Sequence, residues 1–323
     1  MEPTRSKEKQ SLFIYLIVAF LWTWALWIPS ALSAIQQGLV LPSPDNYARL
    51  AAEGFAGGQH VMLAAIFSLA VYGPLIGACL ALAFEQGRSG VRELLANTFN
   101  ARVAPKWYLT ALLIASAIAF IPALLAWLTG NLGQPLLDFG RIALLFLPVF
   151  VLQLLTSGLG EEPGWRGYLL PRLQKRFSPG RTVWILGFIW AVWHYPLTTI
   201  YILQGVPDDA PPIGSVIAVI IGLLSQTIGV IAVTYIYVWL FNRTGSVFLM
   251  IVFHALTNTL PFLFPPIQGP LVLLVGIFPW VIVLALRLVL GKKKFPGSFA
   301  CSQALSTPAH TQGTRAVGTP LAQ

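Results

Sequence analysis

The amino-acid sequence predicts an all-α membrane protein that crosses the bilayer about eight times. Three observations predict this fold: the composition, the recurrence of long apolar runs, and the placement of the basic residues. Of the 323 residues, 56% are hydrophobic and only 10% are charged, whereas soluble domains average about 25% charged residues. A water-soluble fold of this size could not bury so much apolar surface, so lipid is the natural solvent for this chain.

Eight apolar runs are long enough to span a bilayer, which takes about 20 mostly apolar residues in a helix. The first run begins at Leu12 and is too long for a typical signal-peptide core of about 7–15 residues, so we expect an uncleaved span. The sixth is unusually long, and we expect it to tilt or to extend beyond the bilayer. The expected spans are 12–35, 61–84, 107–129, 142–159, 182–203, 213–241, 246–265 and 270–290.

The basic residues test this count and set the orientation. With the N-terminus in the cytoplasm, all Lys and Arg residues except Arg49 and Arg141 fall on the inner side, as the positive-inside rule requires. Removing a middle span would reverse every later loop and destroy this asymmetry. We therefore expect both termini to be cytoplasmic in a multi-pass protein of the cell membrane. The net charge of +9 then reflects cytoplasmic loops and not nucleic-acid binding.

The chain divides into three parts. Residues 1–11 are expected to form a cytoplasmic N-terminus and residues 12–290 one intramembrane domain of eight spans. Residues 291–323 form a polar tail without periodicity, which we expect to be disordered and cytoplasmic. We find no internal repeat, so the sequence does not indicate an inverted-repeat transporter.

Ionisable groups at membrane depth are costly, so they mark candidate functional sites. The first such stretch lies at the cytoplasmic end of the fourth span and contains Glu161 and Glu162. Two adjacent carboxylates repel each other, which suits one of them to act as a general base. On a helix, Glu162 can pair with Arg166 one turn later, which leaves Glu161 free. Pro163 fits the first turn of a new helix, so we expect Glu161 near a break or kink. Alone, the stretch also fits a solvated turn with a surface ion pair.

Two further stretches place histidines inside spans. His194 follows Trp190 by four residues in the fifth span, so the two side chains share a helix face. His254 and Asn258 are also four apart, in the seventh span, and both can donate hydrogen bonds. Each pair alone also fits a buried histidine bonded to a carbonyl or a polar contact between helices. A carboxylate, two histidines and an amide in one half of the membrane together indicate a hydrolytic site.

The order and spacing of these three motifs resemble the CPBP family, which comprises the CAAX prenyl proteases and the bacteriocin-processing or self-immunity proteins, also called Abi. The glutamate pair is followed by Arg166, an aromatic residue stands four before His194, and His254 stands four before Asn258. The aromatic residue is Trp190, where the family often has Phe. The flanking segments 91–95, 107–109 and 167–173 are similar as well.

The resemblance covers about residues 12–290 and implies an intramembrane endopeptidase with an eight-helix core and a cavity open toward the cytoplasm and the lipid. It matches Glu161 to the catalytic glutamate and His194 to its partner. It matches His254 and Asn258 to the groups around the scissile carbonyl oxygen. The implied substrate is a membrane-associated or lipidated peptide or protein, which is prenylated in the eukaryotic branch of the family.

Two mechanisms stay open, because the family is described both as glutamic and as metal-dependent. Without a metal, Glu161 and His194 would activate water, and His254 and Asn258 would form an oxyanion hole. With zinc, Glu161, His194 and His254 would be the ligands, and Glu162 would have to be the base. Asn is a poor zinc ligand and a good oxyanion donor, so we favour the mechanism without a cofactor.

Two other classes of protein fit part of the pattern. Buried His, Glu and Arg also serve proton relays in transporters and channels, but here the polar groups form no chain across the membrane. A catalytically idle relative that binds another membrane protein, for example in immunity, would be expected to lack motif residues, and none is missing here.

Overall fold

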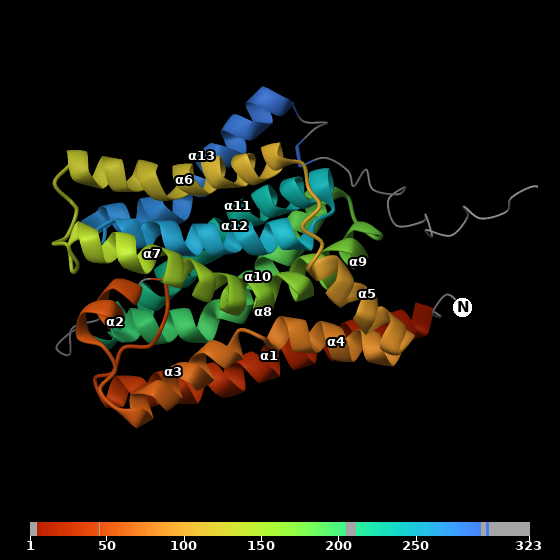
Figure 1. Ribbon diagram of the computed structural model, residues 1–323, viewed down its shortest axis with the longest axis horizontal. Helices are drawn as coiled ribbons and strands as arrows, with labels where there is room; N and C mark the ends of the chain where they lie inside the picture. The colour runs from red at the N-terminus through yellow and green to blue at the C-terminus, as the bar shows by residue number, and fades with distance from the viewer. Residues whose placement is uncertain (1–4, 45, 205–210, 292–294, 297–323) are drawn as a thin grey trace, which may run out of the picture.

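The computed structural model describes residues 5–44, 46–204, 211–291 and 295–296. They form a bundle of helices, most of which run along the long axis of the molecule (Figure 1). Within these residues the only β-type pairing is an isolated bridge between Leu132 and Ile267. The all-α membrane bundle predicted from the sequence is confirmed.

The first part of the chain packs one long helix against a bent pair. α3 and α4 meet at 47° and lie along α1, and the short α2 lies in the connection between α1 and α3 (Figure 1). The elements are α1 (Arg5–Gln36), α2 (Tyr47–Glu53), α3 (Gly58–Ala70), α4 (Gly73–Gln86), α5 (Arg88–Thr98) and α6 (Pro105–Leu128).

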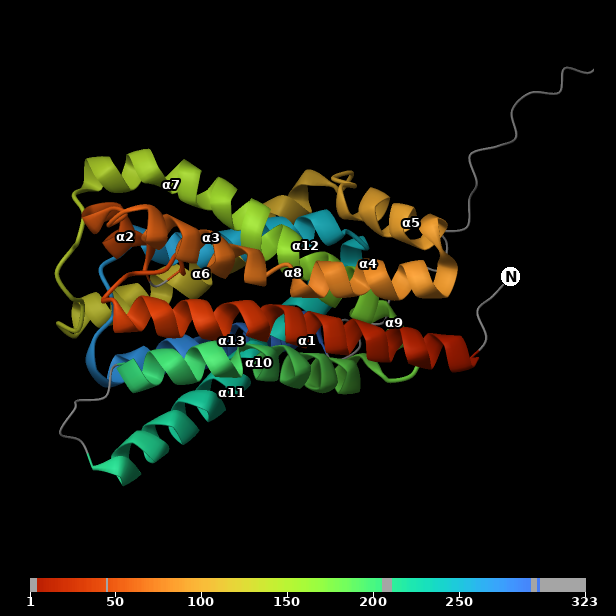
Figure 2. The same ribbon diagram turned by 90° about the horizontal axis from the view of Figure 1, so that it is seen from below.

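The second part begins with an almost continuous helical segment, 139–174, in which two π-helical turns interrupt the α-helix. Its parts are α7 (Phe139–Gln153), η1 (Leu154–Gly158), α8 (Leu159–Glu162), η2 (Pro163–Leu169) and α9 (Leu170–Gln174). After it come α10 (Pro179–Gln204), α11 (Pro212–Thr244), α12 (Val247–Thr259), η3 (Leu260–Leu263), η4 (Gly269–Leu271) and α13 (Val272–Leu290). Figure 2 shows α10 lying beside α1, with α11 crossing at an angle.

Each of the eight expected spans coincides with a helical segment. Among the described residues, α1, α6, the segment 139–174, α10 and α11 are long and apolar enough to cross a membrane, and the bent pair α3–α4 makes a sixth candidate. The other two, Val247–Leu263 and Val275–Leu290, are shorter apolar helices. The count of eight and the orientation of the termini therefore stay predictions.

The two ends of the chain compare differently with the boundaries expected from the sequence. α1 begins at Arg5, so most of the expected N-terminal segment 1–11 continues the first helix. The expected tail 291–323 lies outside the described residues except at 291 and 295–296. There the Phe295 ring is buried against Tyr235 and Trp239 of α11.

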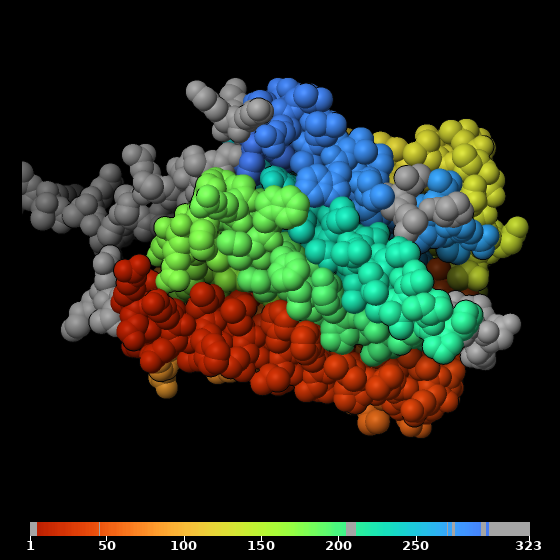
Figure 3. Space-filling view, turned by 180° about the vertical axis from the view of Figure 1, so that it is seen from behind, coloured from red at the N-terminus to blue at the C-terminus, as the bar shows by residue number. Residues whose placement is uncertain are grey.

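The outer surface of the bundle is apolar, as lipid requires. Figure 3 shows α11 on the face that it shares with α1 and α10. Large apolar side chains of the first half of α11 are exposed there, which suits a helix in contact with acyl chains and would be costly in water. These side chains are Ile213, Val216, Ile217, Ile220, Ile221, Leu224 and Ile228.

Small residues bring α8 and η2 close to the bend between α3 and α4. A Cβ on Gly160 would lie 2.7 Å from the carbonyl oxygen of Val71, and one on Gly164 would overlap the carbonyl oxygen of Pro74. Glycines four residues apart on one helix allow two backbones to touch. This contact fixes where the glutamate-bearing turn lies in the bundle.

Candidate active site

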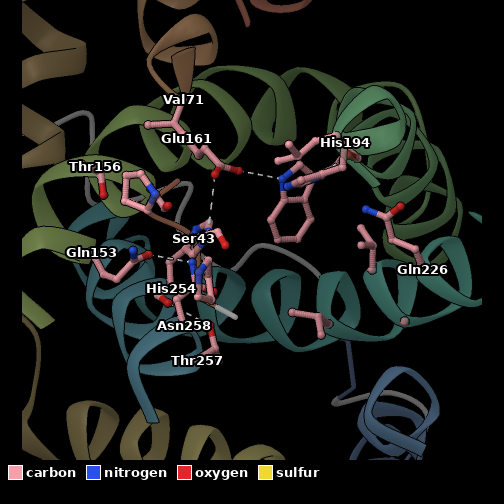
Figure 4. Close-up of a pocket in the computed structure, with 18 of the residues that line it drawn as sticks. Ser43, Val71, Gln153, Thr156, Glu161, His194, Gln226, His254, Thr257 and Asn258 are labelled. Carbon is pink, nitrogen blue, oxygen red and sulfur yellow. Dashed lines mark hydrogen bonds and ion pairs between the residues drawn. The ribbon is translucent and has the colours of Figure 1, made fainter. Parts of the chain in front are cut away.

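A cavity of about 410 Å³ lies inside the bundle and is lined by all four residues predicted to be catalytic (Figure 4). Glu161 comes from α8, His194 from α10, and His254 and Asn258 from α12. Much of the remaining wall is apolar and belongs to α1, α3, α11 and α13. The structure therefore brings the three sequence motifs into one chamber.

The backbone around the two glutamates departs from a regular α-helix, as Pro163 led us to expect. π-helical turns lie directly before and after α8. This geometry directs the two neighbouring carboxylates to different partners. Glu161 lines the cavity and is 3% exposed, whereas Glu162 is fully buried behind it.

Glu162 forms the ion pair with Arg166 that the spacing predicted. Oε1 of Glu162 accepts hydrogen bonds from Nη1 of Arg166 at 2.9 Å and from Nδ1 of His254 at 2.7 Å. The Arg166 guanidinium lies between two aromatic rings, 4.1 Å from the centroid of Trp190 and 3.8 Å from that of Tyr237. Glu162 thus orients the His254 ring, and the Arg166 guanidinium neutralises the charge of the Glu162 carboxylate.

Trp190 connects Glu161 to His194. Its indole Nε1 donates to Oε2 of Glu161 at 2.8 Å, and its backbone carbonyl accepts from Nδ1 of His194 at 2.8 Å. A carbonyl can only accept, so His194 carries its proton on Nδ1 when neutral, and Nε2 is then an acceptor. The sequence predicted the shared face of Trp190 and His194, but not the hydrogen bond from the indole to Glu161.

His254 is the histidine that lies closest to Glu161. Its Nε2 is 3.9 Å from Oε1 of Glu161, which is too long for a direct hydrogen bond. The structure gives no direct contact between Glu161 and His194, although both line the cavity. If Glu161 and His194 are catalytic partners, as the sequence led us to expect, they would therefore act through a water or substrate molecule held between them.

Asn258 is held by residues that the sequence analysis did not single out. Its Nδ2 donates to Oε1 of Gln153 at 2.9 Å, and Nε2 of Gln153 donates to the hydroxyl of Tyr47. Gln153 could have been found as a polar residue in the apolar run of the fourth span. Tyr47 begins α2, in the connection between the first two expected spans, which offered no such signal.

The three residues that would ligate zinc are not arranged as a ligand set. No group of three or more His, Cys, Asp or Glu side chains in the described part of the chain is placed to hold a metal ion. Nε2 of His254 lies 3.9 Å from Oε1 of Glu161, but the structure gives no contact that brings His194 together with either of these two side chains. The arrangement does not fit a three-ligand zinc site, so we derive no step through a metal.

The sequence of this region is similar to known proteases. The family model for the Type II CAAX prenyl endopeptidases, Rce1-like, matches residues 143–260, which contain all four cavity residues predicted to be catalytic. CAAX prenyl protease 2 from Methanococcus maripaludis is 44% identical over 52 residues, which cover 16% of this chain. The match spans 19% of the length of that relative. These similarities confirm the resemblance that the three motifs indicated: the segment that carries the four predicted catalytic residues is similar to the Rce1-like CAAX prenyl endopeptidases.

Proposed function

We propose that this protein is an intramembrane endopeptidase of the CAAX protease type, which hydrolyses a peptide bond of a membrane-associated or lipidated peptide with water activated by Glu161. The observation that supports it best is the single cavity in which Glu161, His194, His254 and Asn258 meet. The similarity of residues 143–260 to CAAX prenyl endopeptidases points to the same activity.

In the proposed mechanism, Glu161 and His194 hold the attacking water. The water donates one hydrogen bond to the Glu161 carboxylate and one to Nε2 of His194, which is an acceptor in the tautomer described above. Glu161 takes a proton as the water oxygen attacks the carbonyl carbon. The carboxylic acid then returns that proton to the leaving amine as the C–N bond breaks.

His254 and Asn258 would stabilise the oxyanion. The buried cluster holds two carboxylates, Glu161 and Glu162, against one guanidinium, so a protonated His254 balances its charge. With Nδ1–H donated to Glu162, the Nε2–H of this ring can donate to the oxyanion. Asn258 uses one amide hydrogen on Gln153 and retains a second for the same oxygen.

The cavity also offers polar atoms for a peptide backbone. The hydroxyl of Ser43 and Oε1 of Gln226 line it and have no hydrogen-bond partner within the described part of the chain. Buried polar atoms require a partner, and a peptide supplies both N–H donors and carbonyl acceptors. The apolar remainder of the wall suits an apolar side chain or a lipid group of the substrate.

A zinc-dependent hydrolysis can be distinguished from the proposed one by chelation and by the zinc content of the purified protein. We expect activity to survive exhaustive chelation, and the purified protein to lack stoichiometric zinc, because the donor set does not fit a three-ligand site. Activity that is lost with chelator and restored by added zinc would favour the metal-dependent mechanism.

The direct test is cleavage of a membrane-tethered peptide by purified protein in vesicles. We expect cleavage by the natural chain and none by Glu161→Ala. A transporter would instead show Glu161-dependent flux without cleavage, and an idle interaction protein would bind the peptide and leave it intact. Absence of cleavage for a range of lipidated and unlipidated peptides would contradict the proposed function.

A further inference from the structure

A chain of three hydrogen-bonded side chains, of which the last two are buried, leads from the cavity to the segment between α1 and α3. Asn258 of α12 donates to Gln153 at the end of α7, and Gln153 donates to Tyr47, the first residue of α2. Gln153 is 1% exposed and Tyr47 is 6% exposed, so bulk water does not satisfy these groups. Figure 4 shows Gln153 and Asn258 directed toward each other at the cavity wall.

The orientation of the Asn258 amide decides whether it can stabilise an oxyanion. An asparagine side chain has a donor end and an acceptor end, and a rotation of 180° exchanges them. With Oε1 of Gln153 as acceptor, the Asn258 nitrogen is on the correct side and keeps a hydrogen for a second partner. The reversed amide would place its oxygen against the oxygen of Gln153, which is unfavourable in a buried site.

Gln153 is itself held from two directions. Its Nε2 is bonded to the Tyr47 hydroxyl, and the Tyr47 ring is packed in a small apolar cluster with Leu137, Val149 and Phe262. That cluster fixes α2 against α7 and η3, so the hydroxyl is placed by packing and not by a flexible loop.

We propose that Gln153 and Tyr47 are positioning residues that act through Asn258, and that the segment between α1 and α3 thereby sets the rate of the chemical step. This inference rests on the proposed peptidase function. Neither residue touches the reacting atoms; their role is to keep the Asn258 N–H directed into the cavity. The same segment also lines the cavity directly, through Pro42, Ser43, Pro44 and Tyr47.

Three substitutions test this chain of hydrogen bonds from Tyr47 through Gln153 to Asn258, which we call the relay. Gln153→Met keeps the length of the side chain and removes both hydrogen bonds. Tyr47→Phe keeps the ring in its apolar cluster and removes only the hydroxyl. We expect each to lower kcat roughly 10- to 100-fold, up to the usual cost of one oxyanion donor, with KM little changed. Gln153→Glu keeps an acceptor for Asn258 and can accept from Tyr47, so it should retain more activity than Gln153→Met.

A double-mutant cycle separates positioning from a general structural role. Once Asn258→Ala has removed the amide, Gln153→Met and Tyr47→Phe should cause no further loss of kcat. Tyr108→Phe is the matched control: it removes a tyrosine hydroxyl that bonds the carbonyl of Ala101 but does not line the cavity and has no link to Asn258, and it should leave kcat unchanged.

The outcomes distinguish this inference from the proposed function. If the natural chain shows no Glu161-dependent cleavage, the proposed function fails and the relay with it. If cleavage is present but the losses add in the Asn258→Ala background, or Tyr47→Phe retains full kcat, the relay is wrong and the peptidase assignment stands. Should Gln153→Met unfold, the double-mutant cycle of Tyr47→Phe with Asn258→Ala still decides the question.

Discussion

Two Glu–Arg pairs take their arginines from the same helical segment, residues 163–174, and only one of them lies directly behind the cavity residues. Arg166 pairs with Glu162 at 2.9 Å, and Arg172 pairs with Glu85 of α4 at 2.8 Å. Both guanidinium groups also stack on aromatic rings, Arg172 at 3.8 Å from the centroid of Tyr168. By composition and distance the two pairs are alike.

Their surroundings differ in three respects. Glu162 and Arg166 have no exposed surface, whereas the Arg172 side chain is 20% exposed. The first pair binds His254 and lies behind Glu161; the second is completed by Ser11, whose hydroxyl contacts Glu85 and Tyr168. Atoms of the first pair, Oε2 of Glu162 and Nη2 of Arg166, also lack a hydrogen-bond partner in the described chain.

The comparison shows that a buried ion pair is not by itself a sign of chemistry. Breaking such a pair is costly in either place. What distinguishes the Glu162 pair is the titratable histidine that it orients toward a second carboxylate at a cavity. Substitutions in the two pairs should therefore separate catalysis from stability.

The largest expected effect is that of Glu161→Gln. Glutamine keeps an oxygen for the indole N–H of Trp190 but cannot accept a proton, so we expect turnover to fall by about 10⁴-fold, the upper range for a general base. The melting temperature should stay close to that of the natural chain. Cleavage rate and thermal unfolding measured on the same preparation test this expectation.

Glu162→Gln should reduce both stability and rate. It leaves Arg166 buried without a countercharge, which costs roughly 3–5 kcal/mol when a buried pair is broken. The amide oxygen can still accept from His254, so the loss of turnover should be smaller than for Glu161→Gln. If Glu162→Gln is inactive while Glu161→Gln remains active, the two carboxylates exchange roles and our choice of base is wrong.

Trp190→Phe tests the indole hydrogen bond to Glu161. Phenylalanine keeps an aromatic ring over Arg166 and the backbone carbonyl that binds His194, but removes the donor at 2.8 Å from Oε2 of Glu161. A hydrogen bond to a charged group contributes about 1.5–3 kcal/mol, so we expect kcat to fall roughly 10- to 100-fold. Unchanged kcat would mean that the ring alone positions the carboxylate.

The sequence predicted which side chains lie together at the cavity because most of the signal is local. Glu162 with Arg166, Trp190 with His194, and His254 with Asn258 each lie one helical turn apart, and a regular spacing in an apolar run is visible without tertiary information. Pro163 also predicted the irregular helix at Glu161. The positions of the helices followed from the lengths of the apolar runs.

Contacts between distant segments could not be predicted in the same way. The bond between His254 and Glu162 depends on how α12 packs against α8, and Glu85 pairs with Arg172 because α4 packs against η2, which leads into α9. The bend between α3 and α4 packs against Gly160 and Gly164, and an apolar run gives no sign of this contact. A single sequence contains no signal for such pairings.

The smallest expected effect among these substitutions is that of Glu85→Gln, and it completes the comparison. Because Arg172 is partly exposed and water can replace some of the lost interaction, we expect the free energy of unfolding to fall by about 1.5 kcal/mol, the lower end for a hydrogen bond to a charged group. The kcat of the folded fraction should not change, since Glu85 does not line the cavity. Glu53→Gln, in the exposed pair with Arg49, is the matched control and should change neither quantity measurably. A fall in kcat for Glu85→Gln at a temperature where the protein is fully folded would show that this second pair also positions the glutamate-bearing segment, and the division between the two regions would have to be abandoned.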